Sequence, residues 1–242
     1  MTKKIFIYDF DGTLTPYPIT RIGVLEQLGY EGGMMSPKFI SMVRENRLAK
    51  NIDVYISCYE VLLDVLKKHN IPRTRENFRM GAFDIEYNLG VVDFFERNKD
   101  LDILNYIVSS GSKDFLEGTV IRKYFKDIYA TTLKYDENGE AFDTDFLMSD
   151  KRKVEVIKKI LNDNNIYDED CSDVIYVGDG LTDLYAMEYV KNHGGETVFV
   201  YLDEENDSLK AAKEVDVVSY FTKADYCLNS DFSNVFLDIC NK

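Results

Sequence analysis

Residues 5–15 read IFIYDFDGTLT, and their pattern indicates a buried strand followed by a polar loop. Its first four residues form a continuous apolar run, which is typical of a short strand buried on both faces of a sheet. The run ends in a polar loop that opens with Asp9 and Asp11. In an extended backbone, residues separated by one position point to the same side, so the sequence predicts two neighbouring carboxylates at the carboxyl end of a buried strand.

Three similar apolar runs occur downstream, and each is followed by polar residues. They are residues 106–108, 174–177 and 197–201, which precede Ser109, Asp179 and Asp203 respectively. Helical patterns lie between the runs, and this alternation indicates an α/β fold with a parallel sheet. Ligands of such sheets bind beyond the carboxyl ends of the strands, so we expect one site built from residues far apart in the sequence. Its expected members at this stage are Asp9, Asp11, Ser109 and Asp179.

Residues 17–88 show a different pattern, with helical periodicity and no convincing buried strand. Within them, residues 54–66 form a strong amphipathic helix that ends before Pro72. We therefore predict a Rossmann-like core made of residues 1–16 and 89–242, with an inserted helical cap domain at residues 17–88. Residues 129–148 are predicted to form a β-hairpin, because a turn-forming Asp-Glu-Asn-Gly segment separates two apolar stretches.

The charge and the cysteines limit the classes of partner. The chain has 43 acidic and 29 basic residues and a formal charge of -14, which repels nucleic acid and anionic lipid. A small anionic substrate is compatible with this charge, since a metal ion and lysines can reverse the potential inside a cleft.

The four cysteines form no CxxC pair, so neither a zinc site nor a disulfide framework is indicated. No signal peptide or membrane span is recognised, so we expect a cytoplasmic protein; its oligomeric state is left open.

The two aspartates of the first loop favour a metal site. Two carboxylates on one side repel each other unless a cation lies between them or one holds a proton. Hard oxygen ligands of this kind suit Mg²⁺. The alternative is an Asp-x-Asp-Gly turn without a metal, and the loop taken alone does not decide between them.

In its context after a strand, the stretch from Asp9 to Thr15 resembles the first signature motif of the haloacid dehalogenase superfamily. In that family the first aspartate attacks phosphorus to form an aspartyl-phosphate, and the second acts as general acid and then general base. The resemblance therefore implies that Asp9 is the nucleophile and Asp11 the acid and base. Members that cleave carbon–halogen bonds lack an aspartate at the second position, so Asp11 favours phosphoryl transfer.

Two further motifs would bind the phosphoryl group. The segment ending in Ser109, Ser110 and Gly111 resembles the second motif, in which the serine side chain and backbone N–H groups at a helix start bind phosphoryl oxygens; a simple helix cap is the alternative. Lys153 at a predicted helix start resembles the third motif, whose lysine neutralises the phosphoryl group and the nucleophile. Lys151 takes this role if the register is two residues off, and a solvated surface lysine is the other alternative.

The fourth motif would complete the metal site. Residues 177–183 read VGDGLTD and match the GDGxxD form of the family. The resemblance implies Mg²⁺ coordination by the carboxylate of Asp9, the backbone carbonyl of Asp11 and the carboxylate of Asp179. Asp183 would not bind the metal itself but would orient a water molecule that does.

The position of the cap and the hairpin is similar to the phosphoserine-phosphatase-like branch of the superfamily. Enzymes of that branch carry a glutamate at the position of Pro18. The resemblance therefore does not imply that this chain recognises an amino-acid head group. Cap arginines are candidates for a second anionic group of the substrate, with surface exposure as the alternative; they are Arg44, Arg47, Arg73, Arg75 and Arg79.

The expected function is that of a Mg²⁺-dependent phosphatase acting on a small phosphomonoester. A phosphomutase that uses the same core is one alternative. A non-catalytic regulatory or binding module is the other, but it would have no need of Asp9, Asp11, Lys153 and Asp179 together.

Overall fold

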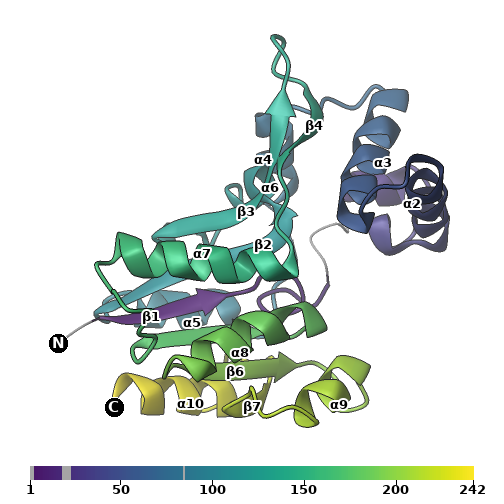
Figure 1. The fold of residues 1–242 in the computed structure, drawn as a ribbon. Coiled ribbons are helices and arrows are strands. Elements are labelled where there is room, and N and C mark those ends of the chain that lie inside the picture. Colours follow the sequence, from purple (N-terminus) through teal and green to yellow (C-terminus); the bar gives the residue numbers. More distant parts are fainter. Residues whose placement is uncertain (1–2, 18–22, 84) are drawn as a thin grey trace.

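The computed structural model describes residues 3–17, 23–83 and 85–242, and a seven-stranded sheet lies at its centre (Figure 1). The strand order is β4-β3-β2-β1-β5-β6-β7. The strands are β1 (Lys4–Tyr8), β2 (Ile103–Ser112), β3 (Asp127–Tyr135), β4 (Ala141–Phe146), β5 (Val174–Gly178), β6 (Glu196–Tyr201) and β7 (Tyr220–Lys223). All neighbouring strands are parallel except β3 and β4. The predicted α/β fold class is confirmed, and each predicted apolar run is a strand of the sheet.

The central strand β1 is buried on both faces because its side chains alternate between two apolar layers. Phe6 and Tyr8 pack in one layer, and Ile5 and Ile7 pack in the other. Helices α5 and α10 contribute to the Phe6 layer, whereas α7, α8 and α9 contribute to the Ile7 layer. These helices are α5 (Val91–Asn98), α7 (Asp150–Asp163), α8 (Leu184–Asn192), α9 (Asp207–Lys213) and α10 (Asp231–Cys240).

The strand order reverses beside β1. From β1 the chain first builds β2 and β3 on one side and later returns to build β5, β6 and β7 on the other. In open parallel sheets the crevice at such a reversal is the usual ligand site. The ligand site is therefore expected at the carboxyl ends of β1 and β5.

The described part of residues 17–88 contains helices and no strand, as predicted. They are α1 (Gly23–Gln27), the short 3-10 helix Gly33–Met35, α2 (Pro37–Lys50), α3 (Val54–Lys68) and α4 (Arg75–Gly81). The Asp53 side chain begins α3 by accepting a hydrogen bond from the Tyr55 N–H at 2.7 Å. After α3, Asn70 takes a left-handed conformation with φ 55°, just before Pro72. Pro18 lies outside the described residues.

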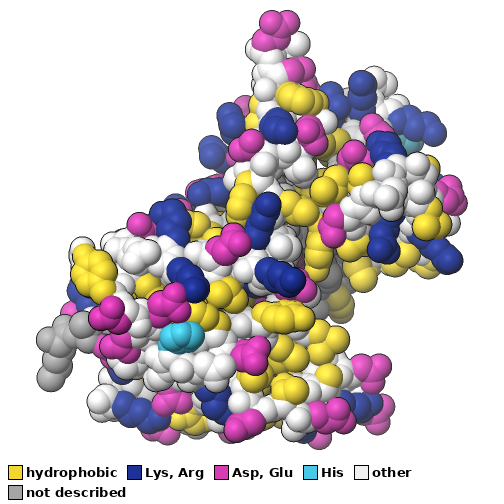
Figure 2. Space-filling view, viewed as in Figure 1, with side chains coloured by type: hydrophobic (Ala, Val, Ile, Leu, Met, Phe, Trp, Pro, Cys, Tyr) yellow, Lys and Arg dark blue, Asp and Glu magenta, His cyan; other side chains and the backbone are white. Residues whose placement is uncertain are grey.

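The predicted hairpin is confirmed as β3 and β4, and Gly139 in its turn has φ 77°. Figure 1 shows the hairpin projecting from the core beside α3. Its residues Leu133 and Ala141 pack in one apolar cluster with Leu62 and Phe78 of the helical segment. Figure 2 shows hydrophobic side chains gathered between the hairpin and this segment. The hairpin and the helical segment thus share one apolar core, and together they are called the small lobe. The division of the chain at residues 17 and 88 stays a prediction.

One short α-helix and two 3-10 helices complete the described elements. They are α6 (Lys113–Leu116), the 3-10 helix Arg122–Tyr124 and the 3-10 helix Leu181–Asp183. Within the described ranges, no helix is both long and apolar enough to cross a bilayer.

Candidate active site

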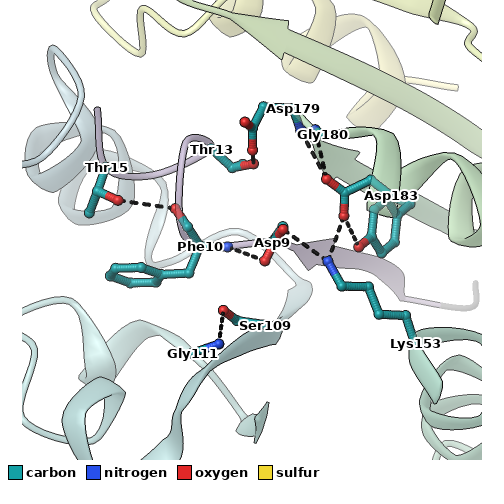
Figure 3. A network of polar contacts seen from close by, with 11 residues as sticks. Asp9, Phe10, Thr13, Thr15, Ser109, Gly111, Lys153, Asp179, Gly180 and Asp183 are labelled. Atoms are coloured by element: carbon teal, nitrogen blue, oxygen red, sulfur yellow. Dashed lines mark hydrogen bonds and ion pairs between the residues drawn. The ribbon is translucent and has the colours of Figure 1, made fainter. Parts of the chain in front are cut away.

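Asp9 follows directly after β1 and lies at the reversal of the strand order. Its backbone N–H donates to the carbonyl of Val177 on β5 at 2.9 Å, which fixes it at the edge of the sheet. Its carboxylate accepts hydrogen bonds from the Lys153 ammonium at 2.9 Å and from the Phe10 N–H at 2.7 Å (Figure 3). Burial raises the pKa of Asp9 to about 7, against the lowering effect of Lys153. The carboxylate is thus desolvated and held by one cation.

Lys153 lies in the first turn of α7 and has no exposed surface. Its ammonium bridges two carboxylates, Asp9 at 2.9 Å and Asp183 at 2.7 Å. Burial lowers the pKa of Lys153, but the charges of Asp183 and Asp9 outweigh this effect, and the pKa lies well above 10.5. Lys151 is exposed on the same helix. Of the two lysines left open by the sequence, the structure brings Lys153 to the site.

Asp183 is fully buried, and both oxygens of its carboxylate accept hydrogen bonds. One oxygen accepts from Lys153 and from the Tyr176 hydroxyl, each at 2.7 Å. The other accepts from the backbone N–H groups of Gly180 at 2.9 Å and Asp179 at 3.2 Å. Burial raises the pKa of Asp183, but Lys153 and these hydrogen bonds outweigh it, so the pKa lies below 3.8. Asp183 therefore stays ionised and holds Lys153 and the loop after β5 in place.

Asp9, Asp179 and Asp183 form an acidic cluster in which one ligand oxygen from each lies within 4.8 Å of the others. Within the described ranges, Lys153 is the ammonium that pairs with this cluster. Burial and the charges of Asp183 and Asp9 raise the pKa of Asp179 well above 3.8. Three carboxylates against one ammonium leave a buried negative charge that a divalent cation would balance, and hard oxygen donors suit Mg²⁺. The donor set therefore fits the expected metal.

The loop after Asp9 closes one side of this cluster. Gly12 has φ 81°, and a Cβ atom built on it would lie 2.1 Å from Asp179 Oδ2, so only glycine allows this approach. Thr13 is buried, and its hydroxyl donates to Asp179 Oδ1 at 2.8 Å. Asp11 is half-buried in the same loop. Burial raises the pKa of Tyr59 on α3, and the charge of Asp11 adds to this effect.

Residues 109–111 lie across the site from Asp179, because β1 pairs with β2 in the register Tyr8 with Ile107. The pairing of β2 with β3 shifts register between Ser109 and Ser112, which leaves Ser110 and Gly111 outside the ladder. The buried Ser109 hydroxyl oxygen accepts from the Gly111 N–H at 3.1 Å (Figure 3). Helix α6 begins at Lys113, so a helix start follows residues 109–111, and the bulge lies between Ser109 and that helix.

The helical segment contacts this bulge. The Tyr59 hydroxyl on α3 donates to the carbonyl oxygen of Ser110 at 3.1 Å. Thr131 on β3 donates to the same oxygen at 2.9 Å. Residues 109–111 are thus fixed from both the sheet and the small lobe.

The cap arginines offer little to a second anionic group. Arg73 pairs with Glu140 at 3.1 Å, and Arg75 pairs with Asp114 at 3.6 Å. The other three, Arg44, Arg47 and Arg79, are exposed. These three of the five side chains thus lie at the surface, and contact with a substrate stays a prediction.

Thr13 and Tyr176 belong to the site although the sequence analysis gave them no role. Thr13 stands within the first motif, where its hydroxyl could have been noticed as a donor. Tyr176 stands in an apolar run, and only its alternation with Ile175 and Val177 places it on the α7 face. The apolar run does not indicate that the Tyr176 hydroxyl donates to Asp183.

Known proteins resemble this chain in family and in fold. A family described as haloacid dehalogenase-like hydrolase matches residues 6–188. A phospho-aspartyl intermediate analogue of phosphoserine phosphatase is 15% identical, with a TM-score of 0.63 over 98% of this chain and 99% of that one. Cytosolic 5'-nucleotidase IIIB bound to cytidine is 13% identical, with a TM-score of 0.61 over 98% and 85%. A HAD family hydrolase from Salmonella enterica is 15% identical, with a TM-score of 0.64 over 91% and 67%. At these identities the likeness shows the fold, and no curated protein matches the chain by sequence.

Proposed function

Because the chain belongs to the haloacid dehalogenase-like hydrolase family, we propose that it is a Mg²⁺-dependent phosphatase that forms an aspartyl-phosphate on Asp9. Its substrate is a small phosphomonoester. The observation that carries the proposal is the buried Lys153 ammonium, which bridges Asp9 and Asp183 beside Asp179. A lysine without exposed surface that pairs with the first carboxylate after the central strand suits transfer of an anionic group to that carboxylate.

In the first half-reaction, an oxygen of Asp9 bonds to phosphorus while the bond from phosphorus to the ester oxygen breaks. Asp11 gives its proton to the departing oxygen, so the alcohol leaves neutral. Lys153 faces the transferred group with a positive charge that needs no reorganisation, since Asp183 holds it in place. The Ser109 hydroxyl and the backbone of Ser110 and Gly111 hold the phosphoryl oxygens.

In the second half-reaction, the Asp11 carboxylate takes a proton from water as the water oxygen bonds to phosphorus. The bond from phosphorus to Asp9 breaks, inorganic phosphate leaves, and both aspartates return to their starting states. Mg²⁺ held by Asp9, Asp179 and the carbonyl of Asp11 would supply charge that screens the nucleophile from the phosphoryl oxygens. Tyr59 would keep the small lobe over residues 109–111 and limit access of bulk water.

Phosphate release from a panel of small phosphomonoesters tests the proposal, with wild type and Asp9→Asn each assayed in Mg²⁺ and in chelator. We expect release by the wild type alone and only with Mg²⁺. Equal rates for Asp9→Asn and wild type would show that the nucleophile is wrongly assigned. An isomerised product without free phosphate would favour a phosphomutase, and a wild type inactive on every ester would favour a binding module.

A further inference from the structure

The carbonyl oxygen of Thr13 accepts two buried hydrogen bonds from distant parts of the chain. Asn88 Nδ2 donates to it at 2.7 Å, and the Tyr226 hydroxyl donates at 2.9 Å. Asn88 stands where the chain returns from the helical segment, and Tyr226 lies between β7 and α10. Neither residue belongs to the four motifs, and Tyr226 lies beyond residues 6–188, which the family matches.

Tyr226 is well placed to fix an atom, because its own position is fixed on several sides. The side chain has no exposed surface, and its ring centroid lies 5.6 Å from that of Phe94 and 4.3 Å from that of Phe232. Its backbone N–H donates to the carbonyl of Leu89 at 2.8 Å, and Arg97 donates to its carbonyl. The hydroxyl therefore has little freedom to follow Thr13 if the loop moves.

Thr13 carries this constraint to the metal site. Its hydroxyl donates to Asp179 Oδ1 at 2.8 Å, while the backbone of Gly12 lies against the other oxygen of the same carboxylate. A shift of the loop would therefore move or rotate Asp179, one of the two carboxylates expected to bind Mg²⁺.

We propose that Tyr226 is a positioning residue for the metal site, acting through Thr13 on Asp179. The proposal rests on the proposed function, since it takes Asp179 as a Mg²⁺ ligand. Loss of a group that orients a metal ligand typically weakens metal affinity about 10–100-fold. Tyr226 acts one step further away and Asn88 remains, so we expect a weakening of about 5–10-fold, at or below the lower limit of that range.

The test is calorimetric titration of Mg²⁺ into the metal-free full chain. The variants are Tyr226→Phe, Thr13→Val, the double variant and Asp179→Asn. Tyr8→Phe is the matched control, because the Tyr8 hydroxyl is buried in the same aromatic layer and has no hydrogen-bond partner among the described residues. The unfolding temperature in chelator reports on the fold, and kcat at saturating Mg²⁺ reports on chemistry.

We expect Tyr226→Phe to weaken Mg²⁺ binding, with kcat at saturating Mg²⁺ near wild type and with Tyr8→Phe binding normally. The double variant should lose less affinity than the sum of the two single losses, because Tyr226 acts in part through the Thr13 hydroxyl. Normal binding by Tyr226→Phe, or additive losses in the double variant, would overturn the positioning role while Asp179→Asn still lost binding. If the wild type bound no Mg²⁺, or Asp179→Asn bound it normally, the metal site of the proposed function would fail and this inference with it.

Discussion

Replacing Lys153 by methionine removes the ammonium while keeping most of the side-chain volume, and we expect it to destabilise the fold as well as abolish most activity. In the wild type, the ammonium pairs with two carboxylates that are themselves buried. The variant leaves Asp9 and Asp183 without that cation. Removing one partner of a buried ion pair typically costs about 3–5 kcal/mol, because the remaining charge stays desolvated. For a chain of this size, this loss corresponds to a decrease in Tm of roughly 6–20 °C.

The pH dependence of this destabilisation follows from the signs of the shifts. The lowered pKa of Asp183 contributes stability above pH 3.8 that is lost as the pH falls through the lower folded value. The raised pKa of Lys153 contributes stability below pH 10.5 that is lost as the pH rises through the higher folded value. Both contributions are present near pH 7. In Lys153→Met the two carboxylates can take up a proton on acidification, so the stability difference from wild type should narrow between pH 7 and pH 5.

Thermal and urea unfolding in chelator measure this effect, with Lys151→Met as the matched control. Lys151 is exposed on the same helix, two residues earlier. We expect the control to unfold like wild type at every pH, as substitutions at exposed sites usually change stability by less than about 0.5 kcal/mol. Equal unfolding temperatures for Lys153→Met and Lys151→Met at pH 7 would refute the reasoning.

Three further predictions concern the loop, the small lobe and the metal. Gly12→Ala should weaken Mg²⁺ binding at least about 10-fold, since the new Cβ would displace the carboxylate of Asp179. Gly139→Ala is the control, because Gly139 also has a positive φ, 77°, but open space around its Cβ, and the Mg²⁺ affinity of this variant in a titration should be unchanged. Equal losses of affinity in the two variants would contradict the role of Gly12. Tyr59→Phe should lower kcat/KM about 2–12-fold, the worth of one hydrogen bond. Tyr30→Phe, which loses only a contact to a cap methionine, should not lower it, and the idea fails if the two variants behave alike. Mg²⁺ at 100 times its Kd should stabilise the wild type by about 2.7 kcal/mol in urea unfolding and Asp179→Asn by much less; no difference between them would speak against the site.

The parts of the fold that depend on local pattern could be predicted from the sequence. Continuous apolar runs gave strands because buried parallel strands need apolar side chains on both faces. Polar residues after those runs indicated the candidate site, since parallel strands bring their carboxyl ends to one edge of the sheet. The lysine register was open by two residues, and only the direction of side chains in the first turn of α7 separates buried Lys153 from exposed Lys151.

Features that depend on packing between distant segments could not be predicted. The contribution of Leu133 and Ala141 to the small lobe requires the relative placement of the hairpin and α3. The bulge at residues 109–111 depends on how β2 pairs with β3 beyond Ser109. Likewise, the hydrogen bond from Tyr226 to Thr13 becomes visible only when residues more than two hundred positions apart are brought together.

Formation of an aspartyl-phosphate on Asp9 is tested by the intact mass of the chain after acid quench during turnover of an active phosphomonoester. We expect a fraction of the wild-type chain to carry one additional phosphoryl group on the peptide that contains Asp9, and none of the Asp9→Asn chain to carry it. An enzyme that turns over with no phosphorylated chain at any quench time, or with the phosphoryl group on another residue, would contradict the account.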